Sequence, residues 1–416
     1  MAEGVGATVP NDETPLWNRD FALVFLGRLF YFGNMHLVLT LLPVFLASLG
    51  TGSAGIGVAM GIPGLVAFFM RPFIGGWVDA GWGRKMMVAG ALLSIAIPLG
   101  YYLTGHLNWP VYLLRVVQGL GLGLFLTASL VSASSTAPRA RLGEALGLTL
   151  VVNIITIGLV PPAALFISFH FGFGPAFALA AVFALGALAC ALIYRPPAKF
   201  SGGDGQGPGW GSLLGERGIL RIILISIISW LIHGAVTSFV ILAAKERGIA
   251  HPGLFFTAYA VAAAGSRLGG GRLADRVERN RLVLISLALS AASLGLLTPA
   301  STLAVFLVAG FLYGLGTAAQ GPVFLSMLID KVGQAHRGRV VSLYGAAADL
   351  GLATGPAVFG FLLPAVGYGG LFAVGAALFA GLGLAAVLGG WREKKAQAAY
   401  PPADALSFSA TDEVDA

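Results

Sequence analysis

Charge is what this chain of 416 residues lacks most. Asp, Glu, Lys and Arg make up only 10% of it, while 57% is hydrophobic. Soluble domains carry roughly 25% charged residues, so the composition excludes a soluble globular protein. The segments 303–328 and 369–391 contain no charged residue at all, and about 20 apolar residues cross a bilayer as a helix. The chain is therefore predicted to cross a membrane several times.

Other absences narrow the function. The single cysteine, Cys190, excludes an intramolecular disulfide. The sequence has no GxxxxGK[ST] loop, so ATP is not expected to be the energy source within this chain, and it has neither HExxH nor GxSxG, which argues against an enzyme. The sequence has no continuous polar run of the kind that forms an ion-channel filter. The acidic, polar N-terminus is not a cleaved signal peptide. No cofactor is expected.

Apolar blocks repeat along the chain, and none alternates as barrel strands do. They predict an all-α membrane protein with twelve transmembrane helices. The predicted spans are 21–46, 55–78, 86–105, 110–134, 143–166, 173–194, 219–243, 253–274, 282–300, 303–328, 340–364 and 369–391. Many of the 60 glycines let helices approach closely in lipid.

The basic residues predict the orientation. If the N-terminus is cytoplasmic, almost all Lys and Arg outside the spans lie on that side, and only Lys245 and Arg247 lie on the other. The positive-inside rule then places both termini in the cytoplasm. We interpret the net charge of +7 as this topology signal and not as a sign of nucleic-acid binding.

A polar linker rich in Gly and Pro divides the spans into two sets of six. The predicted organisation is a cytoplasmic tail, two six-helix bundles joined by a cytoplasmic linker, and a second cytoplasmic tail. These parts are residues 1–18, 19–194, 195–218, 219–391 and 392–416.

The two halves share polar positions at a fixed offset, which predicts an internal repeat. Three pairs lie 196 residues apart on spans two and eight: Arg71 and Arg267, Gly75 and Gly271, and Asp79 and Asp275. Asp349 on span eleven corresponds to Asn153 on span five at the same offset. His36 on span one and His233 on span seven lie 197 residues apart.

These halves, with their motifs, resemble the major facilitator superfamily. Its signature loop between spans two and three reads roughly Gly-x-Leu-Ala-Asp-Arg-x-Gly-Arg-Arg, and residues 271–279, GRLADRVER, are similar except that Glu278 replaces glycine. The copy at 75–85 has one extra residue and lacks the basic residue after Asp79. Residues 115–119, RVVQG, resemble the family's Arg-x-x-Gln-Gly motif.

The resemblance implies a gate on the cytoplasmic side. The aspartates of the signature loop would latch this side while the cavity faces outward, Asp79 towards span eleven and Asp275 towards span five; the alternative is that they only cap helix ends. The expected gate residues are Asp79, Arg84, Lys85, Arg71, Asp275, Arg276, Arg279 and Arg267.

Ionisable groups inside a span are candidates for function because they are costly to bury. Asp349 is the only carboxylate well away from a predicted boundary, and we expect it to carry a proton or to pair structurally with an arginine. Arg115 lies near the outer surface, with Gln118 on the same helix face. The resemblance implies that Arg115 lines the transport path, and Arg28 is a weaker candidate of the same kind.

The two histidines deep in spans one and seven, His36 and His233, could carry a proton, bind an anion or ligate a metal, although such residues usually only pack. Without a nearby cluster of Asp, Glu or Cys they do not predict a metal site. Further polar groups that could orient a substrate are Asn34, Asn153, Tyr313 and Gln320.

We therefore expect a monomeric bacterial cytoplasmic-membrane transporter that uses protons, meets membrane lipid and binds no nucleic acid. The apolar cavity favours export of a small lipophilic or weakly charged molecule by rocking of the two halves. Import of a small metabolite or sugar, and export of a metal or metal chelate, remain open. Residues 351–356, GLATGP, resemble the antiporter motif of drug exporters, but that motif belongs on span five, where this chain has 158–162, GLVPP.

Overall fold

The computed structural model describes residues 15–104, 108–196, 210–274, 277–332 and 337–388, and these ranges contain helices and no strand. The helices are α1 (Arg19–Ser48), α2 (Ser53–Trp77), α3 (Gly83–Thr104), α4 (Trp109–Thr136), α5 (Leu142–Phe171), α6 (Phe173–Ile193), α7 (Trp210–Gly215), α8 (Arg217–Glu246), α9 (Leu254–Ala274), α10 (Arg279–Leu297), α11 (Leu303–Val332) and α12 (Arg337–Leu388). A π-helical turn, Val78–Trp82, joins α2 to α3.

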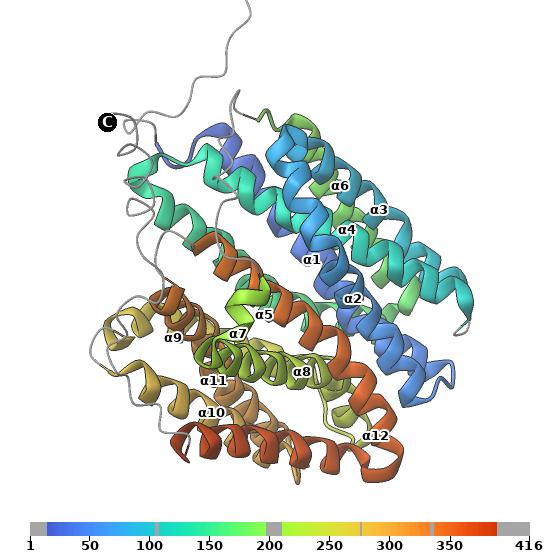
Figure 1. Cartoon of the computed structure of the whole chain (residues 1–416). Coiled ribbons are helices and arrows are strands. Elements are labelled where there is room, and N and C mark those ends of the chain that lie inside the picture. Colours follow the sequence, from blue (N-terminus) through green and yellow to red (C-terminus); the bar gives the residue numbers. More distant parts are fainter. Residues whose placement is uncertain (1–14, 105–107, 197–209, 275–276, 333–336, 389–416) are drawn as a thin grey trace, which may run out of the picture.

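Ten helical stretches in the described ranges are long and apolar enough to cross a membrane. One of them lies in α12, whose 52 residues would measure ~78 Å if straight, far more than a bilayer core of ~30 Å. The chain turns inside α12 at Gly367, whose φ of 67° is in the left-handed region open to glycine. Counting α12 as two segments gives one more span, and α9 gives another, which brings the ten stretches to the twelve predicted spans. Figure 1 shows how these helices are arranged.

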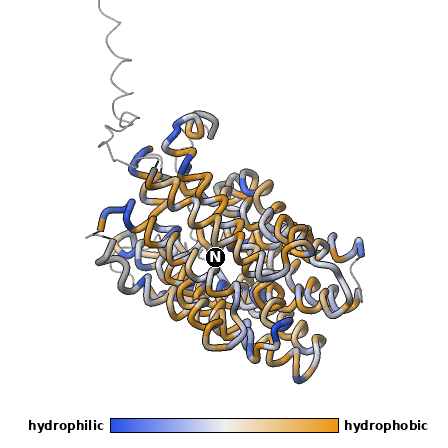
Figure 2. Tube along the Cα trace, turned by 90° about the horizontal axis from the view of Figure 1, so that it is seen from below, coloured by the Kyte–Doolittle hydropathy of each residue, from blue (hydrophilic) through white to orange (hydrophobic). Residues whose placement is uncertain are grey.

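Hydrophobic residues cover most of each helix, and hydrophilic residues gather at helix ends and loops (Figure 2). The start of α1 shows how the ends are fixed. The Asn18 carboxamide oxygen accepts a hydrogen bond from the Phe21 backbone N–H at 2.9 Å, which caps the helix. The Asn18 amide group also donates to the Thr136 carbonyl at 2.8 Å, so the start of α1 is tied to the end of α4.

The helices associate in two groups. Helices α1 to α6 pack mainly with one another, through α1 with α5 and α6, α3 with α4 and α6, and α2 with α4. Helices α8 to α12 form the second group, through α8 with α12, α9 with α11, and α10 with α11 and α12. The groups meet mainly where α2 packs on α12 and α5 packs on α9, and these two interfaces correspond to each other under the sequence repeat.

Glycines bring α2 against α12. A Cβ atom added at Gly57 would lie 2.1 Å from the Pro356 carbonyl oxygen, and one at Gly61 would lie 2.1 Å from the Ala353 carbonyl oxygen. Contacts this close require the absence of a side chain, so the backbones of the two helices touch. We call this contact the α2/α12 seam; it involves the first half of α2.

The α5/α9 interface lies at the same end of the spans. Gly253 packs on Pro162, with an added Cβ 2.6 Å from the Pro162 Cα, and the Thr257 hydroxyl donates to the Gly158 carbonyl at 2.7 Å. The two groups therefore touch near the ends of the helices farthest from the predicted cytoplasmic loops. The two groups of helices diverge towards the left of the view in Figure 1.

Candidate functional site

An ion pair joins the two groups at the end of the α2/α12 seam. Arg71 on α2 donates two hydrogen bonds to the same oxygen of Asp349 on α12, from Nε to Oδ2 at 2.8 Å and from Nη2 to Oδ2 at 2.5 Å. The Arg71 and Asp349 side chains are 31% and 18% exposed. The deep carboxylate expected from the sequence is thus paired with an arginine from the other half.

The sequence makes room for this pair at both helices. A Cβ added at Gly345, one turn before Asp349, would lie 2.5 Å from Arg71 Nη1, so a side chain here would make the guanidinium shift from its place across α12. A Cβ added at Gly64 on α2 would lie 3.0 Å from the Asp349 carbonyl oxygen. The pair faces a small cavity that is also lined by α4 residues, among them Gly123 and Thr127.

The corresponding positions on the other interface are built differently. Asn153 replaces the carboxylate, and its carboxamide oxygen is buried without a hydrogen-bond partner in the described part of the chain. Arg267 is exposed and interacts electrostatically with Tyr259 on its own helix. Only one of the two related interfaces therefore carries an Arg–Asp pair among the residues described.

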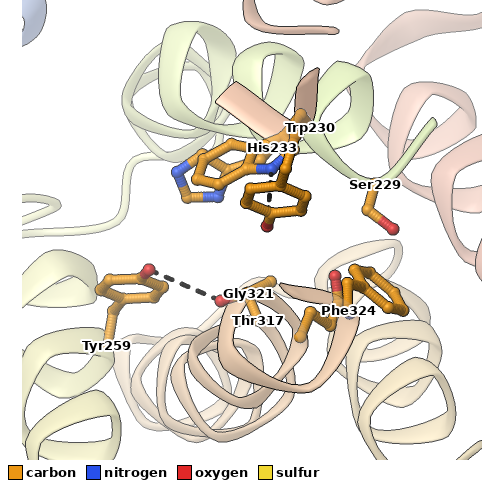
Figure 3. A pocket seen from close by; sticks show the side chains of 9 residues that line it. Ser229, Trp230, His233, Tyr259, Thr317, Gly321 and Phe324 are labelled. Atoms are coloured by element: carbon orange, nitrogen blue, oxygen red, sulfur yellow. Dashed lines mark hydrogen bonds between the residues drawn. The ribbon is translucent and has the colours of Figure 1, made fainter. Parts of the chain in front are cut away.

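A second cavity lies within the C-terminal group, between α8 and α11 (Figure 3). Its lining residues are Ser229, Trp230 and His233 from α8, Tyr259 from α9, Thr317, Gln320, Gly321 and Phe324 from α11, and Tyr344 from α12. We call it the aromatic pocket. The lining contains no Asp, Glu, Lys or Arg.

His233 is held in the aromatic pocket by rings. It stacks on Tyr313, with centroids 5.8 Å apart and planes 7° apart, and meets Trp230 edge-on at 5.4 Å. The hydroxyls of Ser229, which lines the pocket, and of Tyr313, which stacks on His233, are buried without a hydrogen-bond partner among the described residues. Buried polar groups are normally paired, so unpaired ones at a cavity indicate a place for water or a ligand.

His36 lies on α1 and interacts electrostatically with His233. His36 is buried, and its Nδ1 lies 3.1 Å from the hydroxyl oxygen of Thr156 on α5. The Thr156 hydroxyl donates to the Val152 carbonyl at 3.0 Å, which leaves its oxygen able to accept from an Nδ1–H of His36.

The remaining polar candidates of the first half are bonded within that half. Arg115 is 1% exposed; its Nε donates to the Ala59 carbonyl at 2.6 Å and its Nη1 to Gln118 Oε1 at 2.5 Å. Asn34 donates to the Ala180 carbonyl at 2.7 Å, and Arg28 donates to the Ser129 hydroxyl. None of these residues lines the aromatic pocket.

The expected gate is only partly described. The Asp79 side chain, Asp275 and Arg276 lie outside the described residues. Arg84 Nη2 donates to the Leu192 carbonyl at the end of α6 at 2.5 Å. Lys85 lies over the Trp82 ring, and Arg279 pairs with Asp330. These three contacts stay within one group of helices.

The sequence did not predict the contact of Arg71 with Asp349 or most of the aromatic pocket. A signal for the pocket was present, because Trp230 precedes His233 by three residues and shares its helix face. Nothing in the sequence shows that Tyr259 and Tyr344 lie at the same cavity.

The fold is that of a multispan membrane protein. The sequence profile of the Major Facilitator Superfamily matches residues 24–270 and 248–412, and the chain belongs to this family. It is a transporter and not an enzyme.

Among known proteins, the chain is similar to multidrug resistance protein MdtG. It is 26% identical to MdtG of Salmonella paratyphi A over 381 residues, which cover 88% of this chain and 94% of that protein. It is 27% identical to MdtG of Klebsiella pneumoniae over 383 residues, which cover 87% and 91%.

Solved structures share the fold. The nucleoside transporter NupG superposes with a TM-score of 0.70 at 14% identity, covering 89% of this chain and 99% of that one. The human organic anion transporter MFSD10 superposes with a TM-score of 0.65 at 17% identity, covering 90% and 100%.

Proposed function

We propose that the protein is a proton-coupled exporter of small lipophilic or weakly charged molecules that works by alternating access. In this proposal it resides in a bacterial cytoplasmic membrane with both termini in the cytoplasm. Asp349 carries the proton, and the aromatic pocket receives the substrate.

The observation that carries the proposal is the Arg71–Asp349 pair at the α2/α12 seam. Hydrogen bonds to charged groups contribute roughly 1.5–3 kcal/mol, and the states of a conformational switch differ by a few kcal/mol. One such pair between two halves is therefore strong enough to bias their relative position. Its strength depends on the charge of Asp349, and a proton removes that charge.

The expected sequence of events follows because Arg71 and a proton compete for the Asp349 carboxylate. With Asp349 ionised, Arg71 holds α12 to α2 and the glycine seam stays closed. A proton arriving at Asp349 weakens this hold, so protonated and ionised forms favour different arrangements of the halves. Substrate leaving on one side is then exchanged for a proton entering.

The direction of transport rests on the relatives. Proteins named multidrug resistance protein MdtG match 88% of the chain, which favours export. The aromatic, mostly apolar lining of the pocket suits lipophilic molecules better than sugars.

A test uses cells that lack their own major exporters. The wild-type protein and Asp349→Asn are expressed at matched levels, and accumulation of a panel of lipophilic compounds and metal chelates is followed with and without an uncoupler. We expect the wild type to lower accumulation of some compounds, and both the uncoupler and the substitution to abolish the difference. Increased accumulation with the wild type would mean import, and Asp349→Asn acting as wild type would refute the role of Asp349.

A further inference from the structure

We propose that the aromatic pocket selects planar aromatic molecules that are uncharged or anionic and carry hydrogen-bond acceptors, and that it discriminates against organic cations. This inference rests on the proposed function only in taking the pocket as the substrate site.

The walls of the pocket suit a flat ring. Trp230, Tyr259 and Phe324 approach the cavity from three helices, with α8 on one side and α11 on the other (Figure 3). Aromatic pairs prefer offset or edge contacts with centroids 4.5–7 Å apart, the spacing that Trp230 and His233 already show at 5.4 Å. A planar ligand can extend this arrangement.

The hydroxyl groups at the pocket can donate hydrogen bonds to a ligand. The Ser229 hydroxyl is buried and unpaired in the described structure. The Tyr344 hydroxyl accepts from Trp230 Nε1 at 3.2 Å, which leaves its own hydrogen free to donate. The Gln320 amide nitrogen donates one of its two hydrogens to the Ser290 hydroxyl at 3.2 Å. A ligand that offers acceptor oxygens can satisfy the free hydroxyls.

The charges around the pocket disfavour a cation. Asp349 is held by Arg71 and lines a different cavity, together with α2 and α4 residues. The lining of the aromatic pocket has no carboxylate. The lining has one basic group, His233, whose imidazole is either neutral or positive. Aromatic faces attract cations by about 0.5–2 kcal/mol, but no carboxylate of the lining adds an ion pair to this attraction.

The space within the pocket is about 40 Å³ in this conformation, room for a few water molecules. A bicyclic ring therefore enters only when α8 and α11 move apart. Binding is expected to shift the population towards a more open arrangement of these helices.

The test is equilibrium dialysis of the purified full-length chain in nanodiscs at equal pH on both sides, with empty nanodiscs as the blank. The probes share one ring and differ in charge: 2-naphthoate, 2-naphthol and 2-naphthyltrimethylammonium. We expect naphthoate and naphthol to bind at least tenfold more tightly than the cation.

Two serines on α8 give a matched pair of variants. Ser229→Ala removes the unpaired hydroxyl, and Ser226→Ala removes a buried hydroxyl that donates to the Ile222 carbonyl at 2.7 Å and does not line the pocket. Loss of one hydrogen bond should weaken naphthoate binding about three- to tenfold in Ser229→Ala, and binding should stay within twofold in Ser226→Ala. The midpoint of thermal unfolding without ligand should not fall in Ser229→Ala, because the hydroxyl has no partner to lose.

Tighter binding of the cation, equal effects of the two substitutions, or no binding of any probe would overturn the proposal. The dialysis needs no proton gradient and no transport. Its failure would count against the substrate class, whereas a failure of the Asp349→Asn experiment in cells would count against proton coupling.

Discussion

The α2/α12 and α5/α9 interfaces have the same place in the repeated fold but not the same chemistry. At the first, Arg71 of one half bonds to Asp349 of the other. At the second, Arg267 and Asn153 occupy the equivalent positions, so the residue that corresponds to Asp349 is an amide and not a carboxylate. In the proposed mechanism the repeat keeps two related interfaces, and only the α2/α12 interface responds to protons.

Making the two interfaces alike should have the largest effect. Asp349→Asn keeps the size of the side chain and removes its charge, so we expect gradient-driven transport to fall at least tenfold. Glu144→Gln is the matched control, because it makes the same chemical change in an exposed pair with Arg141. Transport assays at equal protein amounts check this, and equal activity of both variants would contradict the assignment.

Removing the positive partner of Asp349, Arg71, should have the next largest effect. Arg71→Gln leaves Asp349 without its partner, and we expect transport to fall about fivefold. Arg71→Lys should retain part of the activity, because lysine keeps the positive charge. It should not retain all of it, because the ammonium group cannot reproduce the geometry of the guanidinium. Arg267→Gln at the equivalent position should change the rate less than twofold. An equal loss at both arginines would mean that the interfaces act alike.

The seam itself can be tested without touching a charge. In Gly61→Ala the new methyl group would lie 2.1 Å from the Ala353 carbonyl oxygen, so α2 must move away from α12. We expect the midpoint of thermal unfolding to fall by several degrees and transport to slow severalfold. Gly265→Ala, where nothing lies within 4 Å, is the control and should be neutral or slightly stabilising. A neutral Gly61→Ala would remove the case for a tightly closed seam.

The smallest effect is expected at Asn153. Its carboxamide oxygen has no partner within the described structure, so Asn153→Ala should not lower the midpoint of thermal unfolding. Transport should change less than twofold. A large loss of transport would show that the second interface contributes a polar group of its own to the transport cycle.

Hydrophobicity and the repeat are enough to predict the architecture. Uncharged blocks give the number of spans, and the offset of 196 residues relates Arg71 to Arg267 and Asp349 to Asn153 from the order of residues alone. The family resemblance rests on the motifs at 75–85, 271–279 and 115–119. These features are local or periodic along the chain, which is why a sequence can carry them.

The contacts between spans could not be predicted in the same way. Arg71 and Asp349 are 278 residues apart, and their pairing depends on the glycines that bring α2 onto α12. Arg115 was expected near the outer surface on the transport path, and the sequence did not predict that its guanidinium bonds to the Ala59 and Met60 carbonyls of α2. Which face of a span meets which neighbour decides between such roles, and that depends on the whole fold.

The most direct test of proton coupling through Asp349 is transport by the purified protein in liposomes with an imposed pH gradient, using a compound that the cell assay identifies as exported. We predict that the wild type accumulates the compound only when the gradient is present, and that Asp349→Asn still equilibrates it across the membrane but does not respond to the gradient. If Asp349→Asn concentrates the compound as the wild type does, the proton is carried elsewhere and the central claim is wrong.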